Sequence, residues 1–274
     1  MKLYYDVDSL DNLDPRVVDR WYRLLRGWLK LWFRPEVRGL ERIPEGAGLF
    51  VGNHNGGFVT PDSFVFASAI WERSGMTHVP YGLGHEWVVK MPPLNQLLCP
   101  IGAVRASHQN AMRVFARGRK VLVYPGGDLE SMCPWRHRDR IVFGGRDGYA
   151  RLAIRAGVPI IPIVAAGAHE TFLVIDDMRW LARGLRLDKL FRLKVLPLTL
   201  SLPWGLTLGV VPTYWPMPTK ILMEIGKPIS FERSGDAAAD DATYVRACAD
   251  RVEIAMQATL TRLARERKQR HRRS

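Results

Sequence analysis

Residues 49–73 read LFVGNHNGGFVTPDSFVFASAIWER, and this stretch decides the fold class. Leu49-Phe50-Val51 is a short apolar run, typical of a buried strand, and it ends in the turn residues Gly52-Asn53-His54. Thr60-Pro61-Asp62 then carries a helix-start signal, because proline is favoured at the first helical position and a capping residue precedes it. The stretch therefore predicts a strand, a glycine-rich turn and a helix that extends to about Arg73.

The same alternation continues along the rest of the chain. Apolar runs predict strands over 78–83, 120–124, 158–165 and 221–225. Periodic apolar patterns predict helices over 16–34, 110–117, 148–156 and 240–267. Strands that alternate with helices are typical of a mostly parallel sheet. We therefore predict an α/β fold in which helices wrap a mostly parallel sheet.

Charge is the unusual feature of the composition. Among 274 residues, 40 Lys and Arg stand against 27 Asp and Glu, which leaves a net charge of +13. This excess predicts an anionic partner, either nucleic acid or a lipid surface. Three widely spaced cysteines and an acidic N-terminus without an apolar run indicate a reduced, cytoplasm-facing protein without a signal peptide.

The predicted helix over 16–34 combines six cations with Trp21, Trp28 and Trp32. This composition is typical of a helix that lies in a membrane interface, and we assign membrane binding to the three tryptophans. The alternative is an ordinary amphipathic helix docked on the domain, with its arginines solvated. We also predict an apolar hairpin or loop over 195–219, because this uncharged segment holds five prolines, too many for a membrane-spanning helix.

His54 and Asp62 are the first candidate catalytic pair. Asp62 falls in the first turn of a predicted helix, near its positive end, where we expect its carboxylate to stay ionised. If the intervening loop folds back, this carboxylate can hold one imidazole nitrogen of His54. The other nitrogen is then available to accept a proton from a hydroxyl. The alternative is a histidine hydrogen-bonded in a turn and an aspartate that caps its helix.

A second candidate region is the strand that runs into Pro125-Gly126-Gly127. Backbone N–H groups at the carboxyl end of such a strand can hold an anion or a developing oxyanion. Arg105 follows another turn, and Arg146 ends a later cluster of cations that starts at Arg136. A solvated loop is the alternative for most of that cluster.

The sequence lacks the local signatures of several other classes. Its histidines and cysteines have no zinc-site spacing, and there is no GxSxG elbow, P-loop or GxGxxG motif. We therefore expect no metal and no bound cofactor.

Taken in order, the blocks resemble the glycerolipid and lysophospholipid acyltransferase superfamily over about residues 37–231. The matching blocks are Asn53-His54 with Asp62, Gly102 to Arg105, Tyr124 to Gly127, Val158 to Ile163, and Gly226-Lys227-Pro228-Ile229. The resemblance implies catalytic roles for His54 and Asp62. It implies substrate-binding roles for Asn53, Arg105, Pro125, Gly126, Gly127, Glu130 and Arg146. It also implies an acyltransferase domain over 37–261, between a membrane-binding region over 1–36 and a basic tail over 262–274.

Two departures bear on the acceptor. Seven residues separate His54 from Asp62, where that superfamily usually has four. The third block, Gly126-Gly127-Asp128-Leu129-Glu130, lacks the arginine that usually follows the glycine of this block. In this respect it is similar to the monoacylglycerol and diacylglycerol acyltransferase-like branch, and the block from Gly145 to Ala150 shows the same similarity. A neutral acylglycerol or a lysolipid with a large headgroup therefore competes with a phosphorylated acceptor.

These features together predict acyl transfer at the cytoplasmic face of a membrane by a peripheral or monotopic enzyme. The donor would be acyl-CoA or an acyl carrier protein, and the acceptor the hydroxyl of a glycerolipid. A lipid hydrolase or thioesterase is the nearer alternative, because a His/Asp pair activates water as readily as an alcohol. A basic nucleic-acid-binding protein is the more distant one, and we expect no nucleic acid as partner, since no RNA-binding sheet motif is present.

Overall fold

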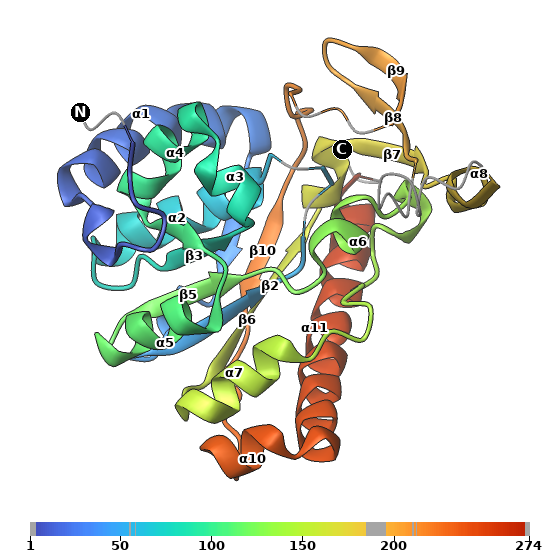
Figure 1. The fold of residues 1–274 in the computed structure, drawn as a ribbon. Coiled ribbons are helices and arrows are strands. Elements are labelled where there is room, and N and C mark those ends of the chain that lie inside the picture. Colours follow the sequence, from blue (N-terminus) through green and yellow to red (C-terminus); the bar gives the residue numbers. More distant parts are fainter. Residues whose placement is uncertain are drawn as a thin grey trace.

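A seven-stranded sheet forms the centre of the computed structural model, which describes residues 4–54, 56–57, 59–184, 196–209, 211 and 213–271 (Figure 1). Its strand order is β1-β10-β6-β2-β5-β3-β4. In that order the strands are Glu36–Arg38, Leu222–Ile225, Ile160–Ala166, Gly48–Gly52, Lys120–Val123, Tyr81–Gly84 and Ala103–Arg105. All neighbours pair in parallel except β10 and β6. The predicted α/β class with a mostly parallel sheet is confirmed.

Helices cover both faces of this sheet, and the alternation along β2 shows how. Leu49 and Val51 point into a core shared with α5, α7, α10 and α11, whereas Phe50 points into a core shared with α1 and α2. A strand buried on both faces must be apolar throughout, which is why 49–51 carries no polar residue. The helices are α1 Pro15–Phe33, α2 Pro61–Ser74, α3 Glu86–Lys90, α4 Pro92–Leu98, α5 His108–Ala116, α6 Gly127–Ser131, α7 Gly148–Ala156, α8 Arg179–Gly184, α10 Asp236–Asp240 and α11 Ala242–His271.

The position of β2 between β5 and β6 determines where the site forms. These three strands are parallel, so their carboxyl ends meet at one edge of the sheet. The turn after β2 carries His54, and the turn after β5 carries Pro125 to Gly127. The two motifs are therefore neighbours, although they lie far apart in the sequence.

Helix α1 begins as predicted but uses its tryptophans differently. The Asp14 side chain accepts a hydrogen bond from the Arg16 N–H, and proline follows at the first helical position. The tryptophans are half-buried: Trp21 stacks on Phe64, while Trp28 and Trp32 lie against Trp215. The three tryptophans therefore pack on the domain in part, and membrane binding by them stays a prediction.

The C-terminal region also differs from the expectation. Residues 262–271 form no separate tail but continue α11, with Leu263 fully buried and Arg267 paired with Glu170 at 2.7 Å. The Arg38 guanidinium also bridges Glu266 to Glu36 on β1. Residues 272–274 lie outside the described residues. The many cations of this segment indicated a solvated tail, although its apolar residues lie on one face of the helix and pack on the core.

A small antiparallel sheet lies outside the main body, formed by β7 Leu173–Asp176, β8 Leu198–Ser201 and β9 Gly205–Leu208 (Figure 1). The β8–β9 hairpin agrees with the hairpin or loop expected over 195–219, of which residues 195, 210 and 212 lie outside the described residues. Among the helices that the structure describes, none combines the length and apolar character needed to span a bilayer.

Because Leu263 is fully buried in the main core, we predict that Leu263→Ala lowers the free energy of unfolding by about 2–5 kcal/mol. Exposed Arg265, on the same helix, is the matched control, and Arg265→Ala should change stability by less than about 0.5 kcal/mol. Denaturant unfolding measures both. Equal, small effects would show that 262–271 is a tail after all.

Candidate active site

His54 follows β2 directly, and Asn53 holds that turn in place. The Asn53 side-chain amide donates to the Ala165 carbonyl at 3.0 Å, and its oxygen accepts from the Ala165 N–H at 2.8 Å. This buried pair of hydrogen bonds continues the pairing of β2 with β6 by one residue. Both polar atoms of Asn53 thus bond to β6, so the side chain positions His54, and substrate binding by Asn53 stays a prediction.

Asp62 occupies the first turn of α2 and is fully buried. Its Oδ1 accepts from the Ser63 N–H at 2.9 Å, whereas Oδ2 has no hydrogen-bond partner among the described residues. Burial raises the pKa of this carboxyl to about 7, because a dry environment disfavours the charged form. Burial therefore opposes the ionised state expected for Asp62, since desolvation outweighs the helix terminus.

Tyr124 connects the two candidate catalytic residues. Its ring lies edge-on to the His54 ring, with centroids 5.3 Å apart, and its hydroxyl lies 2.7 Å from the Ser63 Oγ, next to Asp62. Gly52 leaves room for this ring, because a Cβ there would lie 2.5 Å from it. The sequence analysis placed Tyr124 at the end of a predicted strand and predicted no contact with His54. Gly52, which leaves room for the tyrosine ring, was the sequence signal that could have indicated this contact.

Glu130 links the turn after β5 to the turn after β2. Its carboxyl group is buried and accepts two backbone hydrogen bonds, from the His54 N–H at 2.8 Å and the Val142 N–H at 3.2 Å. Burial raises the pKa of this carboxyl to about 8. Glu130 therefore holds the backbone of His54 and is a positioning residue.

The glycines of the Pro125-Gly126-Gly127 turn make room for the chain's own side chains. A Cβ on Gly126 would lie 2.3 Å from a Glu130 carboxyl oxygen, and one on Gly127 would lie 2.8 Å from the Arg146 Nη1. Arg146 donates to the carbonyls of Pro125 and Gly126 and pairs with Asp128 at 2.7 Å. The Gly127 N–H bonds to the Tyr124 carbonyl, so this amide is already engaged. These contacts give the turn a structural role, and substrate binding by it stays a prediction.

Arg105 lies at the end of the edge strand β4, with β3 and β5 between it and β2. Its guanidinium forms two hydrogen bonds with Asp8 in the N-terminal segment, at 2.8 and 2.7 Å. This pairing lowers the pKa of Asp8, which is a carboxylate at neutral pH. A phosphate contact by Arg105 stays a prediction, and it would have to displace Asp8.

The loop between His54 and Asp62 is longer than is usual in the superfamily that the sequence resembles. Contacts on the side of the small sheet hold this loop. The Gly57 N–H donates to the Ser131 carbonyl, and the Val59 N–H donates to the Tyr214 hydroxyl at 2.9 Å. His169, whose Nε2–H donates to the Cys133 carbonyl, also contacts the His54 backbone. Asn55 and Phe58, within this loop, lie outside the described residues. The sequence alone gave no sign of the contacts made by His169 and Tyr214.

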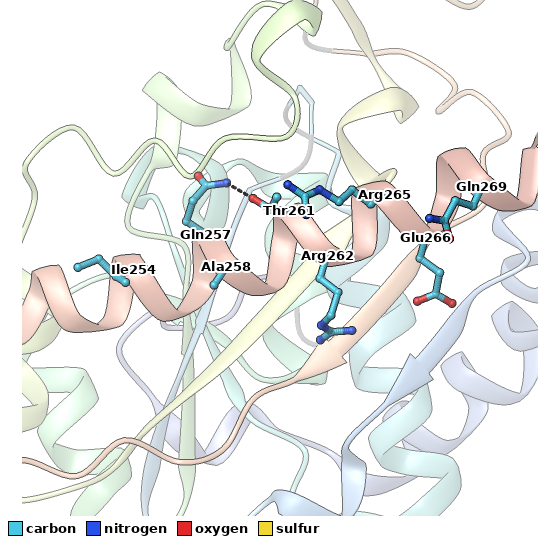
Figure 2. Close-up of a pocket in the computed structure, with 8 residues that line it drawn as sticks. All are labelled: Ile254, Gln257, Ala258, Thr261, Arg262, Arg265, Glu266 and Gln269. Carbon is cyan, nitrogen blue, oxygen red and sulfur yellow. Dashed lines mark hydrogen bonds between the residues drawn. The ribbon is translucent and has the colours of Figure 1, made fainter.

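Figure 2 shows a different candidate region, a surface depression of about 770 Å³. All eight lining residues belong to the last five turns of α11, so it is the surface of one helix. Two of its charged members are paired, Arg262 with Glu224 and Glu266 with Arg38. It offers no buried titratable group. Within the described ranges, no group of three His, Cys, Asp or Glu residues could hold a metal ion.

Comparisons with known proteins identify the family. The acyltransferase family model matches residues 34–166, which include the His54, Asp62 and Pro125–Gly127 segments. An uncharacterized protein of Mycobacterium tuberculosis is 31% identical over 262 residues, covering 94% of this chain and 70% of that protein. The chain belongs to the glycerolipid acyltransferase superfamily. It is an O-acyltransferase.

Two further members of this superfamily are similar to the chain. The "DGAT1/2-independent enzyme synthesizing storage lipids" of Mus musculus is 27% identical, covering 75% of this chain and 56% of that enzyme. The crystal structure of the 1-acyl-sn-glycerophosphate (LPA) acyltransferase PlsC of Thermotoga maritima shares the fold, with a TM-score of 0.54 at 16% identity. The alignment covers 91% of this chain and 79% of that chain.

The raised pKa of Glu130 predicts a pH dependence of stability. The folded state keeps the proton up to about pH 8, while the unfolded chain releases it near the ordinary value of 4.5. Stability from this group is therefore complete below about pH 4.5 and is lost as the pH rises to 8, with a slope of at most about 1.4 kcal/mol per pH unit. Glu130→Gln, which cannot ionise, should remove that slope.

Denaturant unfolding between pH 5 and pH 8 measures this difference. The variant should be destabilised most at pH 5, and the gap between variant and parent should narrow towards pH 8. Asp128→Asn is the matched control on an exposed carboxyl of the same turn. Parallel pH profiles for the parent and Glu130→Gln would show that Glu130 ionises normally in the fold.

Proposed function

We propose that this acyltransferase moves a fatty acyl group from an acyl thioester, acyl-CoA or an acyl carrier protein, to the hydroxyl of a neutral acylglycerol. The observation that carries the proposal is the placement of a histidine ring and a buried carboxyl group around the same tyrosine, Tyr124. The His54 ring and the buried Asp62 carboxyl both lie around Tyr124, and Asp62 Oδ2 has no hydrogen-bond partner among the described residues. A buried oxygen without a partner is costly, and an imidazole N–H would satisfy it.

The chemistry follows from this arrangement. One nitrogen of His54 removes the proton of the acceptor hydroxyl, while the other donates to Asp62 Oδ2. The hydroxyl oxygen attacks the thioester carbonyl carbon, the C–S bond breaks, and the leaving thiolate takes the proton from the imidazolium. General-base help of this kind contributes about 10²–10⁴ in rate. Pairing with the imidazolium would also favour the ionised form of Asp62 and so offset its desolvation.

The charges around the turn after β5 favour a neutral acceptor. Arg146 is paired with Asp128, and Arg105 is paired with Asp8, so both predicted phosphate ligands already have anionic partners. The third block itself contributes one exposed carboxyl group, on Asp128, which would oppose an approaching phosphate, whereas the buried Glu130 carboxyl is neutral. The similarity to an enzyme named for synthesizing storage lipids supports the same choice.

The site of action that we propose is the cytoplasmic face of a membrane, where acylglycerols reside. The net charge of +13 supports attraction to anionic lipid. A thioesterase or lipid hydrolase would use the same His54 and Asp62 with water as the acceptor. The products separate the two: acyl transfer yields an acylated lipid, and hydrolysis yields a free fatty acid.

We predict that His54→Ala lowers acyl transfer by at least about 10²-fold and leaves the folded state intact, because only the base is removed. His108→Ala, on an exposed histidine of α5, is the control and should act like the parent. Asp62→Asn should lower kcat strongly with little change in stability below pH 7, since the buried carboxyl is protonated there. Turnover near that of the parent in a folded His54→Ala variant would contradict the mechanism.

A second prediction concerns the acceptor. With acyl-CoA as donor, monoacylglycerol and diacylglycerol should be acylated faster than lysophosphatidate, because both candidate arginines are already paired. Thin-layer separation of radiolabelled products measures the lipid and the free fatty acid in one assay. A preference for lysophosphatidate would contradict the neutral acceptor, and free fatty acid as the main product would establish hydrolysis.

A further inference from the structure

The β8–β9 hairpin has its apolar and polar faces reversed. Leu200 pairs with Leu206 across the two strands, and Leu198 pairs with Leu208, so these leucines share one face. Leu206 is 63% exposed and Leu208 57% exposed. In a sheet that faces water on one side, the exposed face is normally polar.

The opposite face of the same hairpin is polar and buried. Thr199 and Thr207 pair across the strands, and their hydroxyls lie 2.8 Å apart. Thr199 is fully buried and Ser201 is 2% exposed. Apolar and polar side chains therefore still alternate along each strand, but the apolar side chains are the more exposed ones and the polar side chains the more buried. An inverted strand pair indicates an apolar environment outside the protein.

Tryptophans border this leucine face, which we define as Leu200, Leu202, Leu206 and Leu208. Trp204 lies between the strands and donates its indole N–H to the Thr213 carbonyl. Trp215 bridges to Leu202 and is also exposed. Tryptophan is the residue that concentrates at the boundary between lipid and water, because its ring is apolar and its N–H is polar.

Cations lie beside this border, on α1. Trp215 contacts Trp28 and Trp32, which places the base of the hairpin against the C-terminal half of α1. The exposed side of that helix carries Leu24 and Leu31, which are 75% and 78% exposed, among the exposed cations Arg20, Arg23, Arg26, Lys30 and Arg34. Figure 1 shows α1 and the hairpin along the same upper side of the molecule. This charge is complementary to anionic lipid headgroups.

The hairpin also reaches the candidate active site through its base. Tyr214 precedes Trp215, and its hydroxyl accepts the Val59 N–H in the loop that joins His54 to Asp62. Its ring lies 4.3 Å from that of Phe172, the residue before β7. A lipid surface on the hairpin would therefore be connected to the His54 loop by direct contacts.

We propose that the leucine face of the β8–β9 hairpin, bordered by Trp204 and Trp215, inserts into the interface of an anionic membrane. The exposed leucines and cations of α1 contact the same surface. This proposal rests on the proposed function, because a membrane-embedded acceptor is what such a surface would serve. The half-buried tryptophans of α1 then stabilise the protein and do not contact lipid.

Flotation of the full chain with phosphatidylcholine vesicles that contain about 30% phosphatidylglycerol tests this assignment. Leu206→Ser/Leu208→Ser should weaken vesicle binding at least about tenfold, since two inserted apolar side chains are replaced by polar ones. Ile254→Ser, on an equally exposed aliphatic residue of α11, is the matched control and should bind like the parent. Circular dichroism checks that each variant is folded.

Two outcomes would overturn the proposal. One is unchanged flotation of the hairpin variant, or a parent that does not float. The other is a parent that is dimeric in light scattering and a hairpin variant that is monomeric, which would make the face a contact between two copies. His54→Ala should float like the parent, so vesicle binding is measured independently of catalysis. A failed acyl-transfer assay with normal flotation would then contradict the function and leave this surface standing.

Discussion

The hydrogen bond from the His54 backbone N–H to the Glu130 carboxyl joins two turns that lie 76 residues apart. It fixes the turn after β2 to the segment that follows β5, together with the hydrogen bond from the Gly57 N–H to the Ser131 carbonyl. The second carboxyl oxygen accepts from the Val142 N–H, so a third segment is tied to the same group. The position of the candidate base therefore depends in part on a buried side chain that contacts no substrate in our mechanism.

Burial of polar groups is the condition that the rest of the site shares. Asp62 and Glu130 both have raised pKa values, because desolvation dominates the few hydrogen bonds that they accept. Neutral carboxyls are cheaper to bury than charged ones, and they remain able to accept and donate hydrogen bonds. Within the described part of the chain, one oxygen of Asp62 has no hydrogen-bond partner, and a catalytic role is one explanation for such a buried group.

The apolar residues that are exposed on the protein surface are not the ones that the sequence indicated. Tryptophans that look suited to lipid in the sequence pack against Phe64 and Trp215, and the leucines of a short hairpin are exposed instead. The two observations are connected, since Trp215 ties the hairpin to α1 and thereby shields Trp28 and Trp32. The proposed membrane face, the His54 loop and α1 thus share direct contacts through the segment that ends at Trp215.

The sequence by itself determined the fold class, the family and the approximate extent of the long helices and of the central strands. Local signals were enough there, because Asp14-Pro15 starts a helix wherever it lies and an apolar run such as 49–51 must be buried on both faces. Only the tertiary structure decided which face of α1 is buried, that α11 continues beyond the predicted end at 267, and that β10 runs antiparallel to β6. It alone placed Tyr124 and Glu130 against His54, and it assigned Arg105 to Asp8. Contacts between distant segments and the desolvation of Asp62 depend on packing, and spacing along one chain carries no information about either.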